Sequence, residues 1–255
     1  MNVRALAAEA IGTFILVLMG SFGISSAIIL TNPQDPSLVI LLIVPFAFGL
    51  GLLAAIAIAG ETSGGHFNPA VTLAALFDAR LGWVDAIGYA IAQVIGAVAA
   101  SLTIRLLLTQ DFVAATINRA GATAADATTA QIHAFATEVF LTTVFVAVIL
   151  TVTRKAPSAA IFVIPLTLIG IHFVGITISG ASVNPARSLG PAMVAGDYNG
   201  LWVYLTAPFA GSIIGWAIYR LFNSPDNGAA DDADEDDSDL DDLDGFDDEL
   251  DDARA

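Results

Sequence analysis

The chain has 255 residues, of which 56% are hydrophobic and only 13% charged, and its mean hydropathy is +0.76. A soluble domain of this size has about a quarter of its residues charged, so the composition excludes an ordinary soluble globule. The net charge is −16, and 16 of the 25 carboxylates lie between Asp226 and Asp252. This sign excludes a nucleic-acid binder, and the absence of cysteine excludes disulfides and thiolate metal sites.

Six apolar stretches reach the roughly 20 residues that a helix needs to cross about 30 Å of hydrocarbon. If the N-terminus is cytoplasmic, five Lys or Arg residues near the span ends lie inside and two lie outside, which is the expected bias. The sequence therefore predicts a multi-pass protein of a cell membrane with both termini in the cytoplasm. The predicted spans are Leu6–Leu30, Leu38–Ala59, Trp83–Leu108, Ile132–Thr153, Ala159–Ile178 and Gly200–Phe222.

Two further apolar segments, residues 67–77 and 183–195, are too short to cross, since a helix of that length rises only about 16 to 20 Å. Both contain the tripeptide Asn-Pro-Ala near their start. Asn is a favoured helix N-cap and Pro is favoured at the first helical position, so each tripeptide predicts the start of a half-length helix. The tripeptides are Asn68-Pro69-Ala70 and Asn184-Pro185-Ala186.

The two halves of the chain, about residues 1–108 and 130–222, repeat each other. Ser63-Gly64 precedes the first Asn-Pro-Ala by the same interval at which Ser179-Gly180 precedes the second. Because three spans per half is an odd number, the second half must enter the membrane from the opposite side. We therefore predict an all-α membrane domain over residues 1–222, with six transmembrane helices, two re-entrant half-helices and an inverted 3+3 repeat. The acidic segment 223–255 is predicted to be a disordered tail.

Meeting of the two half-helices at the midplane would place two positive helix ends and the amides of Asn68 and Asn184 at one point. A water oxygen that accepts from both amides turns its hydrogens outward, which would interrupt proton hopping along a file of water. The segments before each tripeptide are small and non-helical in character. Irregular backbone at membrane depth must be buried or line water, so their carbonyls are expected to line a pore. These pore carbonyls belong to Gly64, Gly65, His66, Gly180 and Ser182.

The motifs Ser-Gly-Gly-His-Phe-Asn-Pro-Ala-Val-Thr (63–72) and Ser-Val-Asn-Pro-Ala-Arg-Ser (182–188) closely resemble those of the aquaporin, or major intrinsic protein, family. The resemblance covers about residues 4–222 and implies one pore per protomer in a homotetramer. It implies a selectivity filter of Phe48, His172, Ala181 and Arg187, which is similar to that of the water-selective branch. The glycerol branch typically has Trp, Gly and a second aromatic at the first three places, and an Asp where this chain has Ser188.

Glu9 and Glu138 occupy matching places in the two halves. Buried carboxylates in membrane spans usually have a function, so either could carry protons. The resemblance implies a different role, in which each glutamate accepts hydrogen bonds from a re-entrant loop and braces it. Three scattered histidines lack the spacing of a metal site, and neither a metal nor another cofactor is expected.

We therefore predict a passive membrane channel that conducts water along osmotic gradients and excludes protons and ions, rather than an enzyme. A channel for glycerol or another small neutral solute is the nearest alternative. A proton-coupled secondary transporter is a further alternative, and would show alternating access and a gradient-dependent rate. The last alternative is a membrane anchor whose acidic tail recruits a partner protein.

Overall fold

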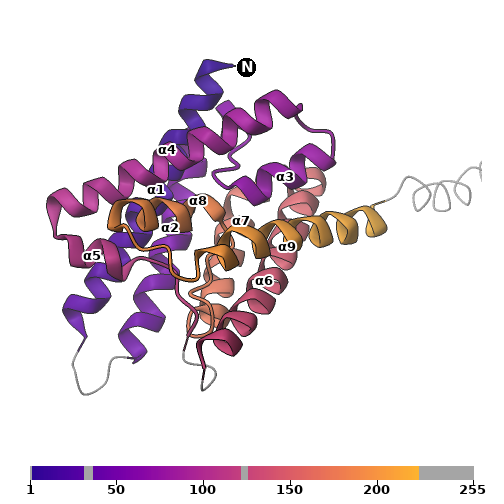
Figure 1. The fold of residues 1–255 in the computed structure, drawn as a ribbon. Coiled ribbons are helices and arrows are strands. Elements are labelled where there is room, and N and C mark those ends of the chain that lie inside the picture. Colours follow the sequence, from indigo (N-terminus) through magenta and orange to yellow (C-terminus); the bar gives the residue numbers. More distant parts are fainter. Residues whose placement is uncertain (1, 32–36, 122–125, 224–255) are drawn as a thin grey trace, which may run out of the picture. The chain divides into compact units, whose positions relative to one another are not determined.

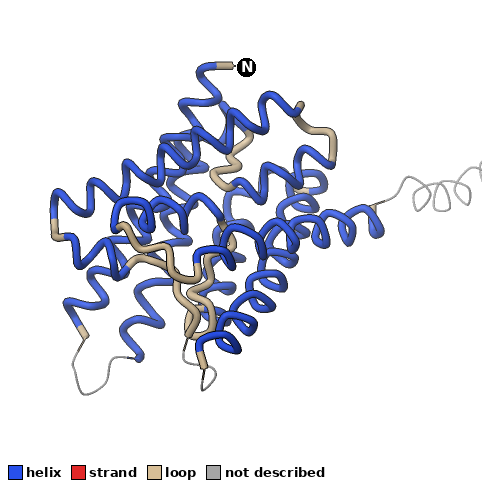
Figure 2. Tube along the Cα trace, viewed as in Figure 1, coloured by secondary structure: helices blue, strands red, loops and turns tan. Residues whose placement is uncertain are grey.

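The computed structural model describes residues 2–31, 37–121 and 126–223 (Figure 1). In these ranges all the regular structure is helical and no strand occurs (Figure 2). The chain divides into a body, residues 1–219, and a second unit, residues 220–255, of which only residues 220–223 are described. The predicted disorder of the acidic tail therefore concerns residues that lie, apart from residue 223, outside the described ranges.

Six of the described helices are long and apolar enough to cross a membrane. They are α1 (Val3–Leu30), α2 (Ser37–Ser63), α4 (Trp83–Leu107), α6 (Ala127–Lys155), α7 (Pro157–Gly175) and α9 (Leu201–Phe222). The two half-length helices are α3 (Pro69–Phe77) and α8 (Pro185–Ala195), and the remaining short helix is α5 (Gln110–Ala115). This arrangement confirms the predicted all-α membrane fold.

Several helix boundaries differ from the sequence-based expectation; α1, for example, begins at Val3 instead of Leu6, and α2 ends at Ser63 instead of Ala59. Helix α6 begins five residues before the predicted Ile132, because Asp126 caps it by accepting the Thr129 backbone N–H at 2.8 Å. Helix α7 ends at Gly175 instead of Ile178, since the chain then enters a series of turns. Helix α5 was not expected, because six residues are too few to produce a periodic pattern.

The helices pack in two corresponding sets within the body. In the first half α1 packs against α2 and α4, and in the second half α6 packs against α7, while α2 and α7 join the halves. Close approach of α1 and α4 depends on Gly96, where a Cβ atom would lie 2.1 Å from the Ala10 carbonyl oxygen. Small residues at such crossings allow backbones to approach closely in membrane bundles.

The repeat of the two halves is visible in matching hydrogen bonds. The Tyr89 hydroxyl of α4 donates to the Ser63 carbonyl at 2.9 Å, and the Tyr204 hydroxyl of α9 donates to the Ser179 carbonyl at 2.8 Å. In each half, therefore, the third long helix holds the start of the loop that leads into the half-helix. This common frame positions α3 and α8 for the site described below.

Candidate functional site

The two half-helices begin with the same capping arrangement. The Asn68 side-chain oxygen accepts the Ala70 backbone N–H at 2.9 Å, and that of Asn184 accepts the N–H groups of Ala186 and Arg187 at 3.0 and 3.2 Å. Pro69 and Pro185 occupy the first helical positions, where no backbone N–H is needed. Local sequence chemistry therefore accounts for both helix starts.

The two helix starts meet through these asparagines. The Asn68 amide nitrogen donates to the Val183 carbonyl at 2.7 Å, and that of Asn184 donates to the Phe67 carbonyl at 2.9 Å. Each half-helix is thus tied by its first side chain to the loop of the other. An amide nitrogen carries two N–H groups, so each asparagine uses one for this tie and retains one.

The loop before α3 is held by the carboxylate of Glu9, which lies fully buried on α1. Its Oε1 accepts the Ser63 hydroxyl at 2.6 Å and the His66 backbone N–H at 3.0 Å. Its Oε2 accepts the Phe67 backbone N–H and the Gln93 side-chain amide, both at 2.7 Å. A charged acceptor with several donors is a strong anchor for irregular backbone.

Glu138 on α6 holds the second loop in the same manner. Its Oε1 accepts the Ser179 hydroxyl at 2.7 Å and the Ser182 backbone N–H at 2.8 Å, and its Oε2 accepts the Val183 backbone N–H at 2.7 Å. Both Phe67 and Val183 have left-handed backbone, with φ of 48° and 47°. Non-glycine residues adopt this region at a cost, so the carboxylates offset strain that the loops store.

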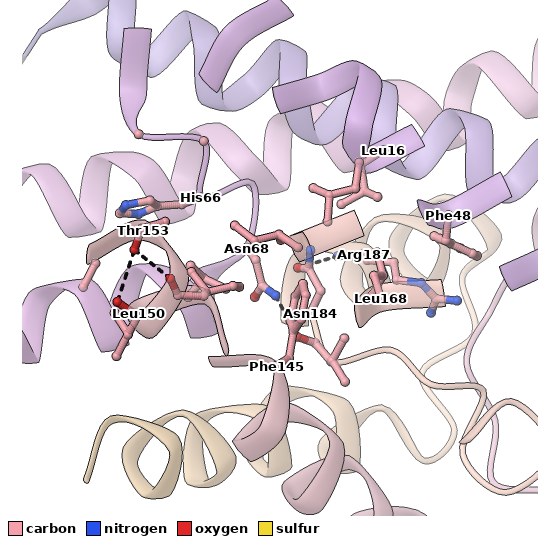
Figure 3. A pocket seen from close by; sticks show the side chains of 18 of the residues that line it. Leu16, Phe48, His66, Asn68, Phe145, Leu150, Thr153, Leu168, Asn184 and Arg187 are labelled. Carbon is pink, nitrogen blue, oxygen red and sulfur yellow. Dashed lines mark hydrogen bonds between the residues drawn. The ribbon is translucent and has the colours of Figure 1, made fainter. Parts of the chain in front are cut away.

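A narrow cavity runs past the meeting point of the half-helices (Figure 3). The space open to water centres is about 70 Å³, enough for a short file of waters at about 10–15 Å³ each. Asn68 and Asn184 lie between two groups of residues: His66, Leu150 and Thr153 on one side, and Phe48, Leu168 and Arg187 on the other (Figure 3).

The Arg187 end of the cavity is closed in by aromatic contacts. The Phe48 and His172 rings stack with centroids 4.6 Å apart, and the Arg187 guanidinium carbon lies 4.2 Å from the Phe48 ring centroid. Ala181 is fully buried but does not line this cavity. In the described part of the chain, His172 Nε2 and Arg187 Nε are buried without a protein hydrogen-bond partner.

The tautomer of His172 follows from its other ring nitrogen. Nδ1 lies 2.9 Å from the Leu168 carbonyl oxygen, which can only accept, so Nδ1 carries the proton. Nε2 is then an acceptor in the neutral ring. The cavity wall here offers a guanidinium donor and an imidazole acceptor beside an aromatic face.

Sequence reasoning missed the residues that hold Arg187. Its Nη1 donates to the side-chain oxygen of Asn118, in the segment between α5 and α6, and its Nη2 lies 3.4 Å from the Gly180 carbonyl. The Asn118 amide also donates to the Gly180 carbonyl at 3.2 Å, and its oxygen accepts the Ser188 hydroxyl at 2.8 Å. Because Asn118 belongs to no motif, no local signal could have identified it.

The five predicted pore carbonyl residues divide between two cavities. Gly64, Gly65, His66 and Ser182 line the narrow cavity, whereas Gly180 lines a neighbouring one with Asn118, Arg119 and Arg187. The Gly180 carbonyl is engaged by both Asn118 and Arg187, as described above.

An ion pair outside the spans joins two connecting segments near this site. Arg119 Nη2 donates to Asp197 Oδ2 at 2.8 Å, and Asp197 Oδ1 accepts the Asn199 backbone N–H at 3.0 Å. The bond from the Asn199 N–H, and to a smaller extent that from Arg119, holds the pKa of the Asp197 carboxyl below its usual range. The pair links the segment after α5 to the segment between α8 and α9.

Comparison with known proteins places this geometry in a family. Residues 1–219 match the sequence profile described as Major intrinsic protein. The chain belongs to the major intrinsic protein family. Members of this family are channels, not enzymes, and pass small neutral solutes such as water or glycerol. The match spans the whole helical body.

Among the relatives of this major intrinsic protein is a glycerol uptake facilitator protein-like 6 from Lactiplantibacillus plantarum, 38% identical over 88% of this chain and 100% of that protein. Another is Nodulin-26 from Glycine max, 34% identical over 88% of this chain and 79% of that protein. The fold matches the aquaglyceroporin from Plasmodium falciparum with a TM-score of 0.74 and 23% identity, covering 86% of this chain and 96% of that one. The structural match concerns the fold alone.

Proposed function

We propose that this chain is a passive channel that conducts water along osmotic gradients and excludes protons and ions. The observation that carries the proposal is the contact of Phe48 with both His172 and Arg187, at centroid distances of 4.6 and 4.2 Å. An aromatic ring in contact with an imidazole and a guanidinium narrows this end of the cavity, which favours a solute of water's size. A three-carbon polyol needs more width and an apolar wall for its carbons.

Exclusion of protons is assigned to the asparagine pair. Each amide of Asn68 and Asn184 retains one N–H, and both residues line the cavity. A water oxygen that accepts from both has its hydrogens directed outward along the file, so no continuous donor chain passes the centre. The positive ends of α3 and α8 oppose cations at this centre, and the fixed charge of Arg187 opposes them at one end of the cavity (Figure 3).

The other predicted roles belong to the same proposal. Glu9 and Glu138 act as braces of the re-entrant loops, and their hydrogen bonds to those loops support this role. The functional unit is a homotetramer of residues 1–222 in the cell membrane, with both termini cytoplasmic. Backbone carbonyls of the loops complete the path, whereas Ala181, predicted to belong to the filter, does not line this cavity.

Conduction of glycerol is the second candidate, because the 38% identical relative is named a glycerol uptake facilitator-like protein. Stopped-flow light scattering on proteoliposomes separates the two by comparing the permeabilities to water and to glycerol. Water permeability well above that of empty liposomes, with little glycerol flux, is the expected result. Glycerol flux comparable to water flux would overturn the water-selective assignment.

Variants of the constriction sharpen this test. Arg187→Val and His172→Gly remove the charge and the imidazole, and should raise permeation of glycerol or ions. Glu61→Gln, at an exposed position of α2, is the matched control and should behave like the unmodified protein. A channel also gives flux set by the osmotic difference alone, whereas a proton-coupled transporter would respond to an imposed pH gradient.

A further inference from the structure

A second arginine lines the cavity, at the end away from Arg187. Arg80, Leu150 and Thr153 all line the same cavity as Asn68 and Asn184. Leu150 and Thr153 lie on the side of Asn68 opposite Arg187 (Figure 3). A fixed positive charge therefore borders both ends of the path, although only Arg187 belongs to the Asn-Pro-Ala motifs.

The Arg80 guanidinium is held by contacts to all three of its nitrogens. Nε donates to Asp78 Oδ2 at 2.8 Å, Nη1 donates to the Thr153 hydroxyl at 2.7 Å, and Nη2 donates to the Leu150 carbonyl at 3.1 Å. The side chain is only 30% exposed. Because the planar guanidinium has hydrogen-bond partners on α6 and in the turn after α3, it is held in one position. A surface arginine without such partners is mobile.

The backbone turn at the end of α3 places Arg80 beside the cavity. The Arg80 N–H donates to the Ala75 carbonyl at 2.9 Å and the Ala79 N–H to the Leu76 carbonyl at 3.0 Å, which together form a Schellman end of α3. This motif needs left-handed backbone at Ala79, where φ is 57° although glycine is the usual residue. The turn therefore carries strain that the Arg80 contacts help to maintain.

We propose that Arg80 is a second specificity-determining residue, a charge barrier that opposes cations at the end of the path remote from Arg187. The proposal rests on the proposed function, because it takes this cavity as the conducting path. Asp78 pairs with Nε at 2.8 Å but, unlike Arg80, does not line the cavity. Water passes because it carries no net charge.

The test measures potassium leak in a background without the first barrier. Proteoliposomes carrying Arg187→Val alone are compared with the Arg80→Gln/Arg187→Val pair. Loss of a second fixed charge should raise potassium flux about tenfold, which corresponds to a modest change in barrier height. Arg154→Gln in the same background is the matched control: Arg154 donates to the Tyr219 hydroxyl at 3.1 Å and does not line the cavity.

A cysteine variant separates the effect of the charge at position 80 from the effect of the lost hydrogen bonds. The chain contains no cysteine, so Arg80→Cys in the Arg187→Val background gives a single reactive thiol. Modification with a cationic thiol reagent should lower potassium leak again, and a neutral reagent of similar size should lower it less. If Arg80 acted only through its hydrogen bonds, the cationic and the neutral reagent would change the potassium leak equally.

The proposal is overturned if the Arg80→Gln pair conducts water but leaks no more potassium than Arg187→Val alone, or if the two reagents act equally. Failure of the proposed function is recognised separately, by glycerol flux comparable to water flux in the unmodified protein. That result would change the conducted solute and leave the potassium comparison valid.

Discussion

Replacement of either buried glutamate by glutamine should destabilise the fold, because the amide cannot accept all the hydrogen bonds that the carboxylate accepts. Glu9 receives the Ser63 hydroxyl and the His66 N–H on one oxygen, and the Phe67 N–H and the Gln93 amide on the other. The hydroxyl can turn and the Gln93 amide can flip, but a backbone N–H only donates. Whichever way the new amide is oriented, one backbone N–H faces another donor.

The magnitude follows from this count. A buried donor left unpaired costs about 1–3 kcal/mol, which is a large share of the about 5–15 kcal/mol by which native domains are stable. Glu138→Gln also leaves at least one backbone N–H unpaired, since the two carboxylate oxygens each accept one backbone N–H, from Ser182 and from Val183. Glu9→Gln and Glu138→Gln should therefore each lower the free energy of unfolding by about 1–3 kcal/mol.

Denaturant unfolding in detergent, followed by tryptophan fluorescence, measures this loss. The control is Glu61→Gln, whose exposed position should keep the change within about 0.5 kcal/mol. Proton flux in proteoliposomes is measured in parallel and should not change. If either variant is as stable as the control, or folds normally and alters proton flux, the bracing role is wrong and a proton-carrying role is favoured.

Three further predictions concern the Arg187 end and its surroundings. Gly20→Ala should lower water permeability and cost about 1–3 kcal/mol, because its Cβ would lie 2.1 Å from a Phe48 ring atom. Asn118→Ala removes the acceptor of Arg187 and should raise the ratio of glycerol to water permeability by about tenfold or more, since a bond to a charged group is worth about 1.5–3 kcal/mol. Asp197→Asn should lower the melting temperature slightly at neutral pH, and the difference should vanish in acid.

The sign for Asp197 follows from its lowered pKa. The carboxylate stabilises the fold above its unfolded pKa of about 3.9, and this stabilisation is lost as the pH falls through the folded value. A melting difference that grows in acid would contradict this account.

For Gly20→Ala the control is Gly82→Ala, where a Cβ meets nothing within 4 Å, and equal water permeability of the two variants would refute the clash. An unchanged solute ratio in Asn118→Ala would show that Arg187 is held without it.

The fold was predictable because its strongest signals are local. Span length and hydropathy identified the six long helices, and the Asn-Pro pairs identified the starts of α3 and α8. The boundary of α6 was missed because hydropathy marks where a span becomes apolar, whereas Asp126 caps the helix earlier in polar sequence. A six-residue helix such as α5 has no periodicity to detect.

The partners of the site were less predictable, because they come from distant parts of the chain. Asn118 lies 69 positions from Arg187, and Leu150 lies 70 positions from Arg80. Gly20 is required only by the place of the Phe48 ring on another helix. Such requirements arise from packing between elements, and a single sequence carries no periodic or motif signal for them.

The two halves share a frame but carry their charges by different routes. Arg187 is the third residue after Asn184, and the matching residue after Asn68 is Val71. The frame depends on backbone groups, two glutamates and two asparagines, so the side chain at this third position is free to differ. The first half instead brings its positive charge to the cavity with Arg80, from the turn that follows α3. An inverted repeat can therefore build a symmetric scaffold around a cavity that is lined by arginines from unrelated positions of the sequence.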